Sequence, residues 1–320
     1  MSSYTSTILI TGGTSGLGYP AALSLARSQP NTLILIASRS DHDSAAATIN
    51  KATGHSNCAY APLDLGTLAS VRSFVGSYSK KGYPPLTALL LNAGLQFAGT
   101  PTYNADGIEK TFAVNHVGHA LLFYLLIPYL AANARIVITA SGTHDPAQKT
   151  GMPNAVYTSA GELAKPSGTN ALKDGRQQYT NSKLANMLWG YALDRRVKRA
   201  GKSWTVTLFD PGLMPGTGLA RDAGPVVRFV WLSVLPRLIW LLRIVAIKNT
   251  HTPKESGQAL ARLAVAEDVK GVSGKYFEGL REIRSSRDSY LVEKQEDLWK
   301  WTLETVAKDD GEKIKLGELS

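Results

Sequence analysis

The sequence predicts an α/β fold in which one doubly wound parallel sheet has helices on both faces. Six short runs of apolar and β-branched residues are typical of buried strands: Thr7–Ile10, Thr32–Ala37, Cys58–Pro62, Ala88–Asn92, Arg135–Thr139 and Thr205–Phe209. Segments with helical spacing of apolar residues lie between them, among them Pro20–Ser28, Thr67–Tyr78, Gly107–Leu130 and Tyr179–Arg199. Because strands alternate with helices, we expect βαβ connections, which keep consecutive strands parallel.

The last third of the chain departs from this alternation. Residues 213–250 contain glycine and proline and then a very apolar run, so we interpret them as an insertion. Thr252-Pro-Lys-Glu255 has the pattern of a capping box with proline at the first helical position, which predicts a helix to about Ala266. We also expect an edge strand, a closing amphipathic helix and a frayed charged tail, at Lys275–Phe277, Tyr290–Ala307 and 308–320 respectively.

Composition limits the class of protein. Hydrophobic residues make up 44% of the chain and charged residues 19%, which is ordinary for a globular protein with a sizeable core. No repeat or linker divides the sequence, so residues 1–320 are expected to form a single domain. The one cysteine, Cys58, excludes an internal disulfide and fits a reducing compartment. The N-terminus does not resemble a signal peptide, so we expect a cytoplasmic location or a membrane surface facing the cytoplasm.

The formal net charge of +10 raises nucleic acid and anionic membranes as partners. Lysine and arginine are spread along the chain, and no helix-turn-helix or aromatic-interleaved basic motif accompanies them. We therefore expect no nucleic-acid partner, and we attribute the charge to a phosphate-bearing cofactor and a basic surface. His116 and His119 have helical spacing without a third ligand in the sequence, so we interpret them as structural and expect no metal site.

A glycine-rich loop follows the first predicted strand and begins the first predicted helix. Gly12, Gly16 and Gly18 permit a tight turn, a close approach to a pyrophosphate and close packing of the helix on the strand. The helix N-terminus attracts phosphate through free N–H groups. A glycine-rich loop alone also fits an ordinary turn. Its place between strand and helix favours a dinucleotide site and a Rossmann fold, with further loop contacts from Thr14, Ser15 and Leu17.

The ends of the next strands indicate which dinucleotide binds. A carboxylate after the second strand would bind the ribose 2′-hydroxyl of NAD, but this chain has Ser38 and Arg39 there. A guanidinium beside hydroxyl groups suits a 2′-phosphate and predicts NADP(H). After the third strand, Asp64 and Leu65 are expected at the adenine, although Asp64 also fits a helix N-cap. The turn after the fourth strand either brings backbone close to the cofactor or is only a turn: Asn92, Ala93 and Gly94.

Tyr179 and Lys183 place a phenol and an ammonium group four residues apart on one face of a predicted helix. A free phenol has a pKa of about 10, and a nearby lysine is expected to lower it. Such pairs are common on exposed helices, but beside the glycine-rich loop this pair predicts a proton-transfer site. Ser141 follows a strand at the edge of the sheet where ligands bind. Asn115 lies within a predicted helix, where a buried amide role is expected.

Six motifs carry a resemblance to a known family: Thr11–Gly18, Asn92–Gly94, Asn115, Ser141, Tyr179-x-x-x-Lys183 and Pro211-Gly212. In this order they resemble the short-chain dehydrogenase/reductase family, and the resemblance covers about residues 7–307. Three segments are most similar to the branch of retinol dehydrogenases, WW-domain oxidoreductases and protochlorophyllide reductases: Asn115–His119, Tyr179–Asn186 and Pro211–Leu219.

The resemblance implies a role for each polar residue. Tyr179 is then the general acid/base on the substrate oxygen, and Lys183 tunes it while holding the nicotinamide ribose. Ser141 orients the carbonyl group, and Asn115 anchors a water molecule that relays protons. The resemblance also implies contacts at the nicotinamide end of the cofactor from Pro211, Gly212 and Thr217.

Two insertions, at about 142–178 and 213–250, are expected to shape the substrate site. Residues 225–247 are long enough to span a bilayer, but a spanning helix is costly because the segment contains Arg228, Pro236, Arg237 and Arg243. A lid over an apolar substrate is favoured, since a lid is expected just after Pro211-Gly212. An interfacial segment with snorkelling arginines, giving peripheral membrane contact, and a plain core segment remain open.

The lid and the interfacial interpretation both favour a bulky, lipophilic ketone, aldehyde or alcohol as substrate. Two other functions remain open. Reduction of a C=C bond, as in protochlorophyllide reductases, is associated with cysteines near the active site, whereas Cys58 lies far upstream. A non-catalytic NADP(H)-binding protein of this family usually lacks one of three positions, and this chain retains Ser141, Tyr179 and Lys183. A monomer and a homodimer are equally compatible with the sequence.

Overall fold

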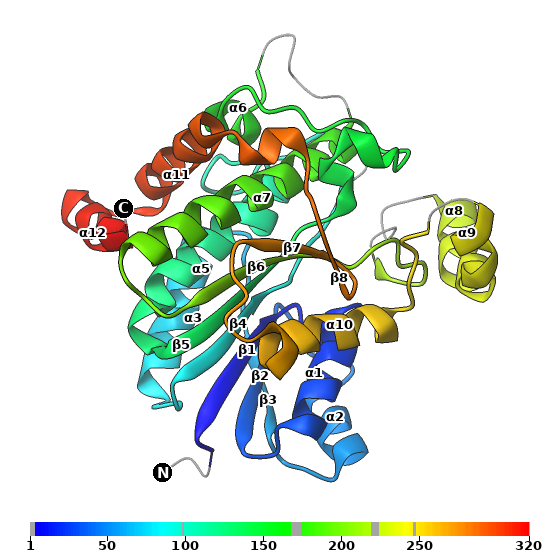
Figure 1. Ribbon diagram of the computed structural model, residues 1–320, viewed down its shortest axis with the longest axis horizontal. Coiled ribbons are helices and arrows are strands. Elements are labelled where there is room, and N and C mark those ends of the chain that lie inside the picture. Colours follow the sequence, from blue (N-terminus) through cyan, green and yellow to red (C-terminus); the bar gives the residue numbers. More distant parts are fainter. Residues whose placement is uncertain (1–3, 98, 168–173, 219–223, 246–247, 320) are drawn as a thin grey trace.

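The computed structural model describes residues 4–97, 99–167, 174–218, 224–245 and 248–319. It contains eight strands: β1 (Ser6–Thr11), β2 (Thr32–Ser38), β3 (Cys58–Pro62), β4 (Leu86–Leu91), β5 (Leu130–Thr139), β6 (Thr205–Asp210), β7 (Lys275–Glu278) and β8 (Arg281–Ile283). All of these form one sheet in the order β3-β2-β1-β4-β5-β6-β7-β8, parallel from β3 to β7 (Figure 1). The chain starts in the middle of the sheet and winds outward in both directions, which confirms the doubly wound Rossmann fold.

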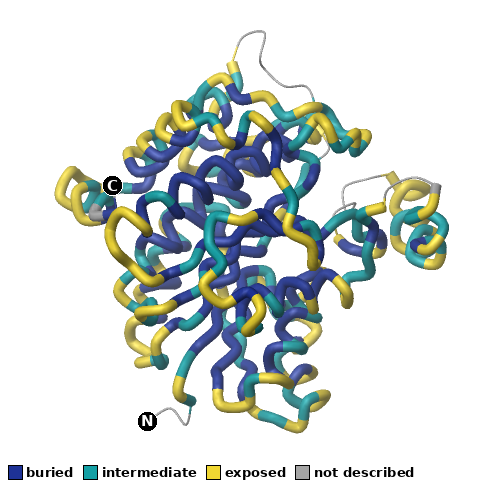
Figure 2. The backbone as a smooth tube through the Cα atoms, viewed as in Figure 1, coloured by how far each residue is buried: buried dark blue, intermediate teal, exposed yellow. Residues whose placement is uncertain are grey.

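Two groups of helices cover the two faces of the sheet. On one face lie α1 (Gly18–Ser28), α2 (Ala45–Thr53) and α10 (Pro253–Val265). The helices of the other face are α3 (Leu68–Lys80), α4 (Lys110–Phe112), α5 (Gly118–Leu126), α6 (Ala160–Ala164), α7 (Gly175–Arg199), α11 (Val292–Val306) and α12 (Asp310–Leu316). Along β1, Ile8 and Ile10 pack on the first group and Leu9 packs on the second, as strand periodicity requires. Both faces are therefore hydrophobic core (Figure 2).

The helix predicted over Gly107–Leu130 is interrupted. It begins at Lys110, changes to a π-helical turn at Ala113–Val117, continues as α5 and ends in a 3-10 turn at Ile127–Tyr129. The π-helical turn contains Asn115, which is fully buried. A single π-helical turn within an α-helix is often found at functional sites.

The C-terminal third differs from the sequence predictions in two places. The capping box before α10 is confirmed, because the Thr252 hydroxyl accepts from the Glu255 N–H and the Glu255 carboxylate accepts from the Thr252 N–H, at 3.2 and 2.8 Å. The strand predicted at Lys275–Phe277 is confirmed as β7, but its expected place at the edge of the sheet is wrong, since β8 pairs antiparallel with β7 and covers its outer side. β8 has only three residues, too few for a recognisable pattern.

The expectation of a frayed tail is also wrong. Asp309 caps α12 by accepting from the Glu312 N–H at 2.8 Å. Glu312 then forms an ion pair of 2.7 Å with Arg72 of α3. Leu316 is buried against the second helix group. These contacts are made with residues far away in the sequence, so the tail is ordered by tertiary packing.

One helical segment belongs to neither face. It consists of α8 (Pro225–Phe229), a π-helical turn (Val230–Val234), a 3-10 turn (Leu235–Leu238) and α9 (Ile239–Val245), and we call residues 224–245 the apolar lobe. The lobe projects beside the sheet in Figure 1. Two helices among the described residues are long and apolar enough to cross a membrane. In Lys110–Tyr129, 78% of the most apolar 18-residue window is buried in the protein, whereas in Pro225–Ile244, within the lobe, only 6% is buried. The interpretation of this segment as core is therefore wrong.

Candidate active site

A large cavity opens at the carboxyl ends of β1, β2, β4, β5 and β6, where the direction of winding reverses between β1 and β4. Ligands of open α/β sheets bind at this point. The cavity volume is about 1090 Å³, enough for a dinucleotide and a substrate. Of the residues that the sequence assigned to the site, Gly18 and Asn115 do not line the cavity. The lining residues among them are Gly12, Thr14, Ser15, Gly16, Leu17, Ser38, Arg39, Asp64, Leu65, Asn92, Ala93, Gly94, Ser141, Tyr179, Lys183, Pro211, Gly212 and Thr217.

The glycine-rich loop leaves space for a ligand by packing tightly on itself. Gly12 has a φ of 69°, and a Cβ there would lie 3.0 Å from the Cα of Ala93. A Cβ on Gly18 would lie 2.2 Å from the carbonyl oxygen of Gly12, so Gly18 packs α1 against the loop instead of facing the cavity. No side chain caps the first turn of α1. The N–H groups of this turn therefore have no competing side-chain acceptor, and Gly16 and Leu17 beside them line the cavity.

Ser38, Arg39 and Asp64 lie together at the far end of the cavity, beyond β2 and β3. Arg39 is exposed and its guanidinium makes no hydrogen bond or ion pair within the described part of the chain. The Ser38 hydroxyl is buried and lacks a partner among the same residues. Asp64 accepts from the Gly66 N–H at 2.8 Å, whereas Thr67 caps α3, so the alternative interpretation of Asp64 as the N-cap is wrong.

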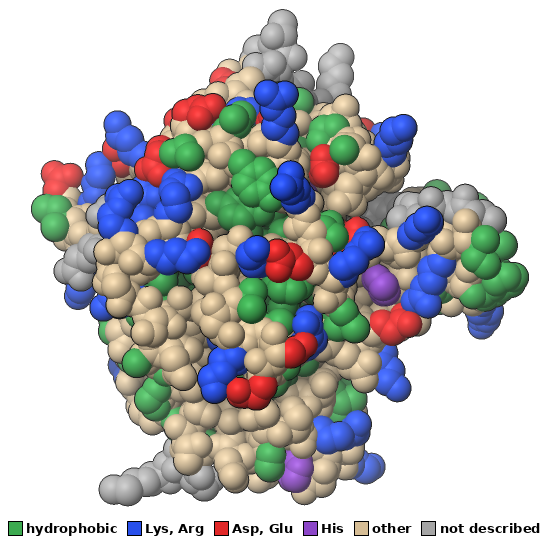
Figure 3. All heavy atoms as spheres, viewed as in Figure 1, with side chains coloured by type: hydrophobic (Ala, Val, Ile, Leu, Met, Phe, Trp, Pro, Cys, Tyr) green, Lys and Arg blue, Asp and Glu red, His purple; other side chains and the backbone are tan. Residues whose placement is uncertain are grey.

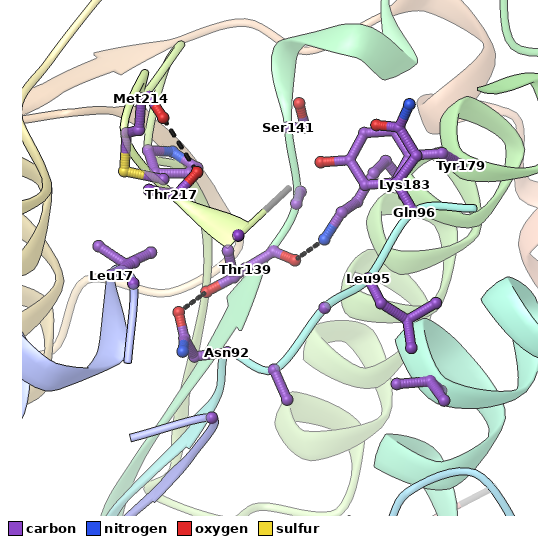
Figure 4. Close-up of a pocket in the computed structure, with 18 of the residues that line it drawn as sticks. Leu17, Asn92, Leu95, Gln96, Thr139, Ser141, Tyr179, Lys183, Met214 and Thr217 are labelled. Carbon is purple, nitrogen blue, oxygen red and sulfur yellow. Dashed lines mark hydrogen bonds between the residues drawn. The ribbon is translucent and has the colours of Figure 1, made fainter. Parts of the chain in front are cut away.

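Ser141, Tyr179 and Lys183 meet in the middle of the cavity, from the end of β5 and from α7. The Ser141 hydroxyl lies near the Tyr179 phenol and lowers its pKa. The Lys183 ammonium group donates to the carbonyl oxygen of Thr139 at 3.0 Å and lies 5.6 Å from the centre of the Tyr179 ring. Figure 4 shows these three polar groups together on one side of the cavity, opposite Leu17, Met214 and Thr217. The helix predicted over Tyr179–Arg199 is confirmed as α7, which begins earlier, at Gly175.

Asn115 is buried outside the cavity and supports this arrangement through hydrogen bonds. Its amide NH₂ donates to the Leu95 carbonyl and to the Ser182 hydroxyl, both at 3.0 Å, and its side-chain oxygen accepts from the Leu95 N–H at 2.9 Å. Both amide donors are therefore occupied by the protein. Asn115 holds the loop after β4 against α7, and its contact with a proton-relaying water stays a prediction.

Comparisons with known proteins agree with this geometry. The family model described as short chain dehydrogenase matches residues 6–161. Mouse polyprenol dehydrogenase is 30% identical over 299 residues, 91% of this chain and 81% of that protein. Human retinol dehydrogenase 13 is 30% identical over 295 residues, 92% of this chain and 82% of that protein. The chain belongs to the short-chain dehydrogenase/reductase family. The resemblance to the branch that contains retinol dehydrogenases is confirmed.

A solved structure shows the same fold. A crystallised protein of Mycobacterium paratuberculosis superposes with a TM-score of 0.68 at 24% identity, covering 95% of this chain and 94% of that one. Members of the family bind a nicotinamide cofactor, and the cavity of this protein has the size and position that such a cofactor requires.

Burial shifts the pKa values of the two central groups of the cavity in opposite directions. It raises the pKa of Tyr179 to about 12, an effect that the nearby Ser141 hydroxyl reduces and Asp210 increases. It lowers the pKa of Lys183 to about 8, against the opposing influence of Asp210. The expectation of a lowered phenol pKa is therefore wrong. Burial raises the pKa of Tyr179, and the Lys183 ammonium group, 5.6 Å from the ring centre, does not offset this effect. Tyr179 is therefore a neutral phenol near pH 7.

Asp210 is a site residue that sequence reasoning missed. It ends β6, is 2% exposed and lines the cavity. Its carboxylate accepts from the Gly212 N–H at 2.9 Å and from the Asn249 amide at 2.8 Å, so it joins the two ends of the second insertion. Burial raises its pKa. The available signal was an acidic residue at the carboxyl end of a buried strand, directly before Pro211-Gly212.

The histidines and the cysteine have structural contacts. His144 lies next to the site but does not line the cavity; its Nε2 accepts from the Ser286 N–H at 3.1 Å and its Nδ1 donates to the Ser141 carbonyl at 2.6 Å. Burial lowers the pKa of His116 to about 3 and that of His119 to about 4, so both are neutral. Cys58 is buried on β3, where burial raises its pKa to about 12. The described residues contain no group of ligands that could hold a metal ion.

The open side of the cavity has a mixed lining from the two insertions and is where a substrate would enter. Its lining side chains are mostly long and several are apolar: Gln148, Met152, Arg176, Met214, Val227 and Trp231. Trp231 belongs to the apolar lobe and donates to the Thr217 carbonyl at 2.9 Å, so the lobe is fastened to the loop after Pro211-Gly212. Residues 168–173, 219–223 and 246–247 of the insertions lie outside the described residues.

The lowered pKa of Lys183 makes the stability of the protein depend on pH. Between pH 8 and the ordinary lysine value of about 10.4, the unfolded chain binds a proton that the folded protein does not, so stability rises with pH. We predict that wild type gains about 2 kcal/mol in free energy of unfolding relative to Lys183→Met between pH 7 and pH 9.5, measured by urea unfolding. Exposed Lys51→Met is the control and should show no such gain. A pH-independent difference for Lys183→Met would contradict the burial argument.

Proposed function

We propose that the protein is an NADP(H)-dependent oxidoreductase that interconverts a ketone or aldehyde and its alcohol on a bulky, lipophilic substrate. One observation carries the proposal: the hydroxyls of Ser141 and Tyr179 and the ammonium of Lys183 share a cavity with the glycine-rich loop. A substrate carbonyl and a dinucleotide then fit side by side at the switch point of the sheet.

The cofactor site fits NADP(H) at both ends. The loop from Gly12 to Gly18 would hold the pyrophosphate, since Gly12 and Gly18 leave no room for a Cβ whereas the space beside Gly16 is open. Ser38, whose buried hydroxyl lacks a partner in the described structure, and Arg39 with its free guanidinium would hold the 2′-phosphate. Lys183 would bind the nicotinamide ribose. When bound, NADPH supplies the hydride for carbonyl reduction.

The protein's own residues then control the proton. In reduction, the hydroxyls of Ser141 and Tyr179 donate hydrogen bonds to the substrate oxygen, and Tyr179 passes its proton to that oxygen as negative charge develops there. Burial keeps Tyr179 protonated near pH 7, which suits the donor role. Lys183 keeps a positive charge near the phenol once the proton has left. In alcohol oxidation the same phenol accepts the proton in reverse.

The lining of the outer cavity supports a large apolar substrate. Met152, Met214, Val227 and Trp231 provide apolar contacts, while Gln148 and Arg176 offer polar ones near the entrance. The names of two relatives, polyprenol dehydrogenase and retinol dehydrogenase 13, point to long apolar alcohols as their substrates. We therefore place polyprenyl, retinoid and steroid carbonyl compounds first in a substrate panel, with NADPH consumption as the readout.

Tyr179→Phe tests the reaction. We predict a fall in kcat of roughly 10²–10⁴-fold on any panel member that wild type reduces, because the proton donor is lost. Binding of NADPH should change little. Tyr191→Phe removes a buried hydroxyl from the same helix, where it bonds Ser285 outside the cavity, and should keep turnover. Turnover that survives in Tyr179→Phe would show that the proton comes from another group.

Arg39→Ala tests the choice of cofactor. Loss of a charged hydrogen-bond donor to the 2′-phosphate typically costs about 1.5–3 kcal/mol, so we predict a rise in the Kd for NADPH of roughly 10–100-fold, with the Kd for NADH unchanged. The measurement is calorimetric titration at fixed salt. Arg27→Ala on α1 is the matched control, since Arg27 is exposed and does not line the cavity. Equal affinity of wild type for NADH and NADPH would contradict the assignment.

A further inference from the structure

The outer face of the apolar lobe has no partner in the fold. Eight of the fourteen exposed large hydrophobic side chains in the described structure belong to residues 224–245. The most exposed are Val226 at 74%, Ile244 at 73%, Phe229 at 63% and Trp240 at 62%. Figure 3 shows hydrophobic side chains gathered on the outer edge of the lobe. On a soluble protein, a contiguous exposed apolar patch of this kind usually marks an interaction site.

The charged residues within the lobe are all basic. Residues 223–254 contain no aspartate or glutamate, but they include Arg228, Arg237, Arg243, Lys248 and Lys254. Arg228 and Arg237 are exposed on the lobe itself, whereas Arg243 is paired with Glu255 at 2.6 Å. Neither of the two forms an ion pair within the described residues, and Arg237 donates only to the Ser233 carbonyl. Apolar and aromatic side chains bordered by arginines without an acidic partner are the pattern of a helix that lies at the surface of an anionic bilayer.

The inner side of the lobe is fastened to the rest of the protein. The Gly216 N–H donates to the Trp231 carbonyl at 2.9 Å, and the Arg243 side chain donates to the Thr250 carbonyl at 2.7 Å. Ile239 is buried, and Val227 and Trp231 line the cavity. A helix held along one side by these contacts cannot cross a bilayer without breaking them. It can, however, lie on one, with its outer side in lipid and its inner side over the cavity.

We propose that the apolar lobe anchors the protein to the surface of an anionic membrane. Its outer side chains enter the boundary between headgroups and acyl chains, while Arg228 and Arg237 extend to lipid phosphates. This orientation brings the mouth of the cavity to the lipid surface, because Val227 and Trp231 belong to both the lobe and the cavity lining. Entry of a lipophilic substrate from the bilayer follows only if the proposed oxidoreductase function holds. The anchoring itself does not depend on it.

Vesicle sedimentation of the full-length protein tests the anchor. Wild type should sediment with vesicles of phosphatidylcholine and phosphatidylserine, and much less with phosphatidylcholine alone. The double variant Phe229→Ser/Trp240→Ser should lose at least about tenfold in affinity for the mixed vesicles, since it removes two large apolar side chains from the outer face. The matched control, Leu280→Ser/Val292→Ser, removes exposed apolar residues elsewhere and should bind as wild type does.

Arg228→Gln/Arg237→Gln should reduce binding to the mixed vesicles by roughly tenfold while leaving the weak binding to phosphatidylcholine unchanged. NADPH binding by each variant reports whether the fold is intact, since none of the substituted residues lines the cavity. Wild type that stays in the supernatant, or equal loss in the lobe and control variants, overturns the anchor. So does a concentration-dependent dimer that the lobe variant abolishes without any vesicle binding, since a second copy would then cover the patch.

Discussion

The hydroxyl of Thr11 connects the glycine-rich loop to helix α7, which contains Tyr179 and Lys183. At the end of β1 it accepts from the N–H groups of Asn92 and Ala93, at 2.8 and 2.9 Å, and so holds the end of β4 beside the glycine-rich loop. It also bonds Nε2 of His119 at 2.9 Å, and Nδ1 of the same ring bonds the Asn115 carbonyl. The Asn115 amide continues the network to Ser182 on α7, next to Lys183.

This network explains why the interior near the site is polar. All of these bonds except the one from Ala93 are buried, and a buried polar group without a partner is costly, so the network permits few alternative arrangements. A neutral His119 suits it, because the ring must donate at Nδ1 and accept at Nε2. The result is a rigid base on which Tyr179 and Ser141 meet. The apolar lobe, in contrast, is held by a few bonds at the rim.

Much of the fold and site was predictable because local patterns carried it. The buried strands are continuous apolar runs, the glycine-rich loop lies between strand and helix, and the Tyr179–Lys183 spacing follows one helix face.

Features that depend on distant contacts were not predictable. The tail is ordered by Arg72, far upstream, and the π-helical turn positions Asn115 against Leu95 and Ser182. Asp210 was missed because its partner Asn249 lies at the other end of an insertion. For the lobe, sequence left three interpretations, and exposure removed the core one.

The central claim is that one substrate oxygen contacts the hydroxyls of both Tyr179 and Ser141. A crystal structure of the protein with NADP⁺ and an alcohol from the substrate panel tests this most directly. The account predicts the alcohol oxygen within about 2.6–3.2 Å of both hydroxyls, with the nicotinamide beside the carbon that bears it. An alcohol bound with its oxygen elsewhere, while the nicotinamide occupies the cavity, would contradict the assignment of Tyr179 as the proton donor.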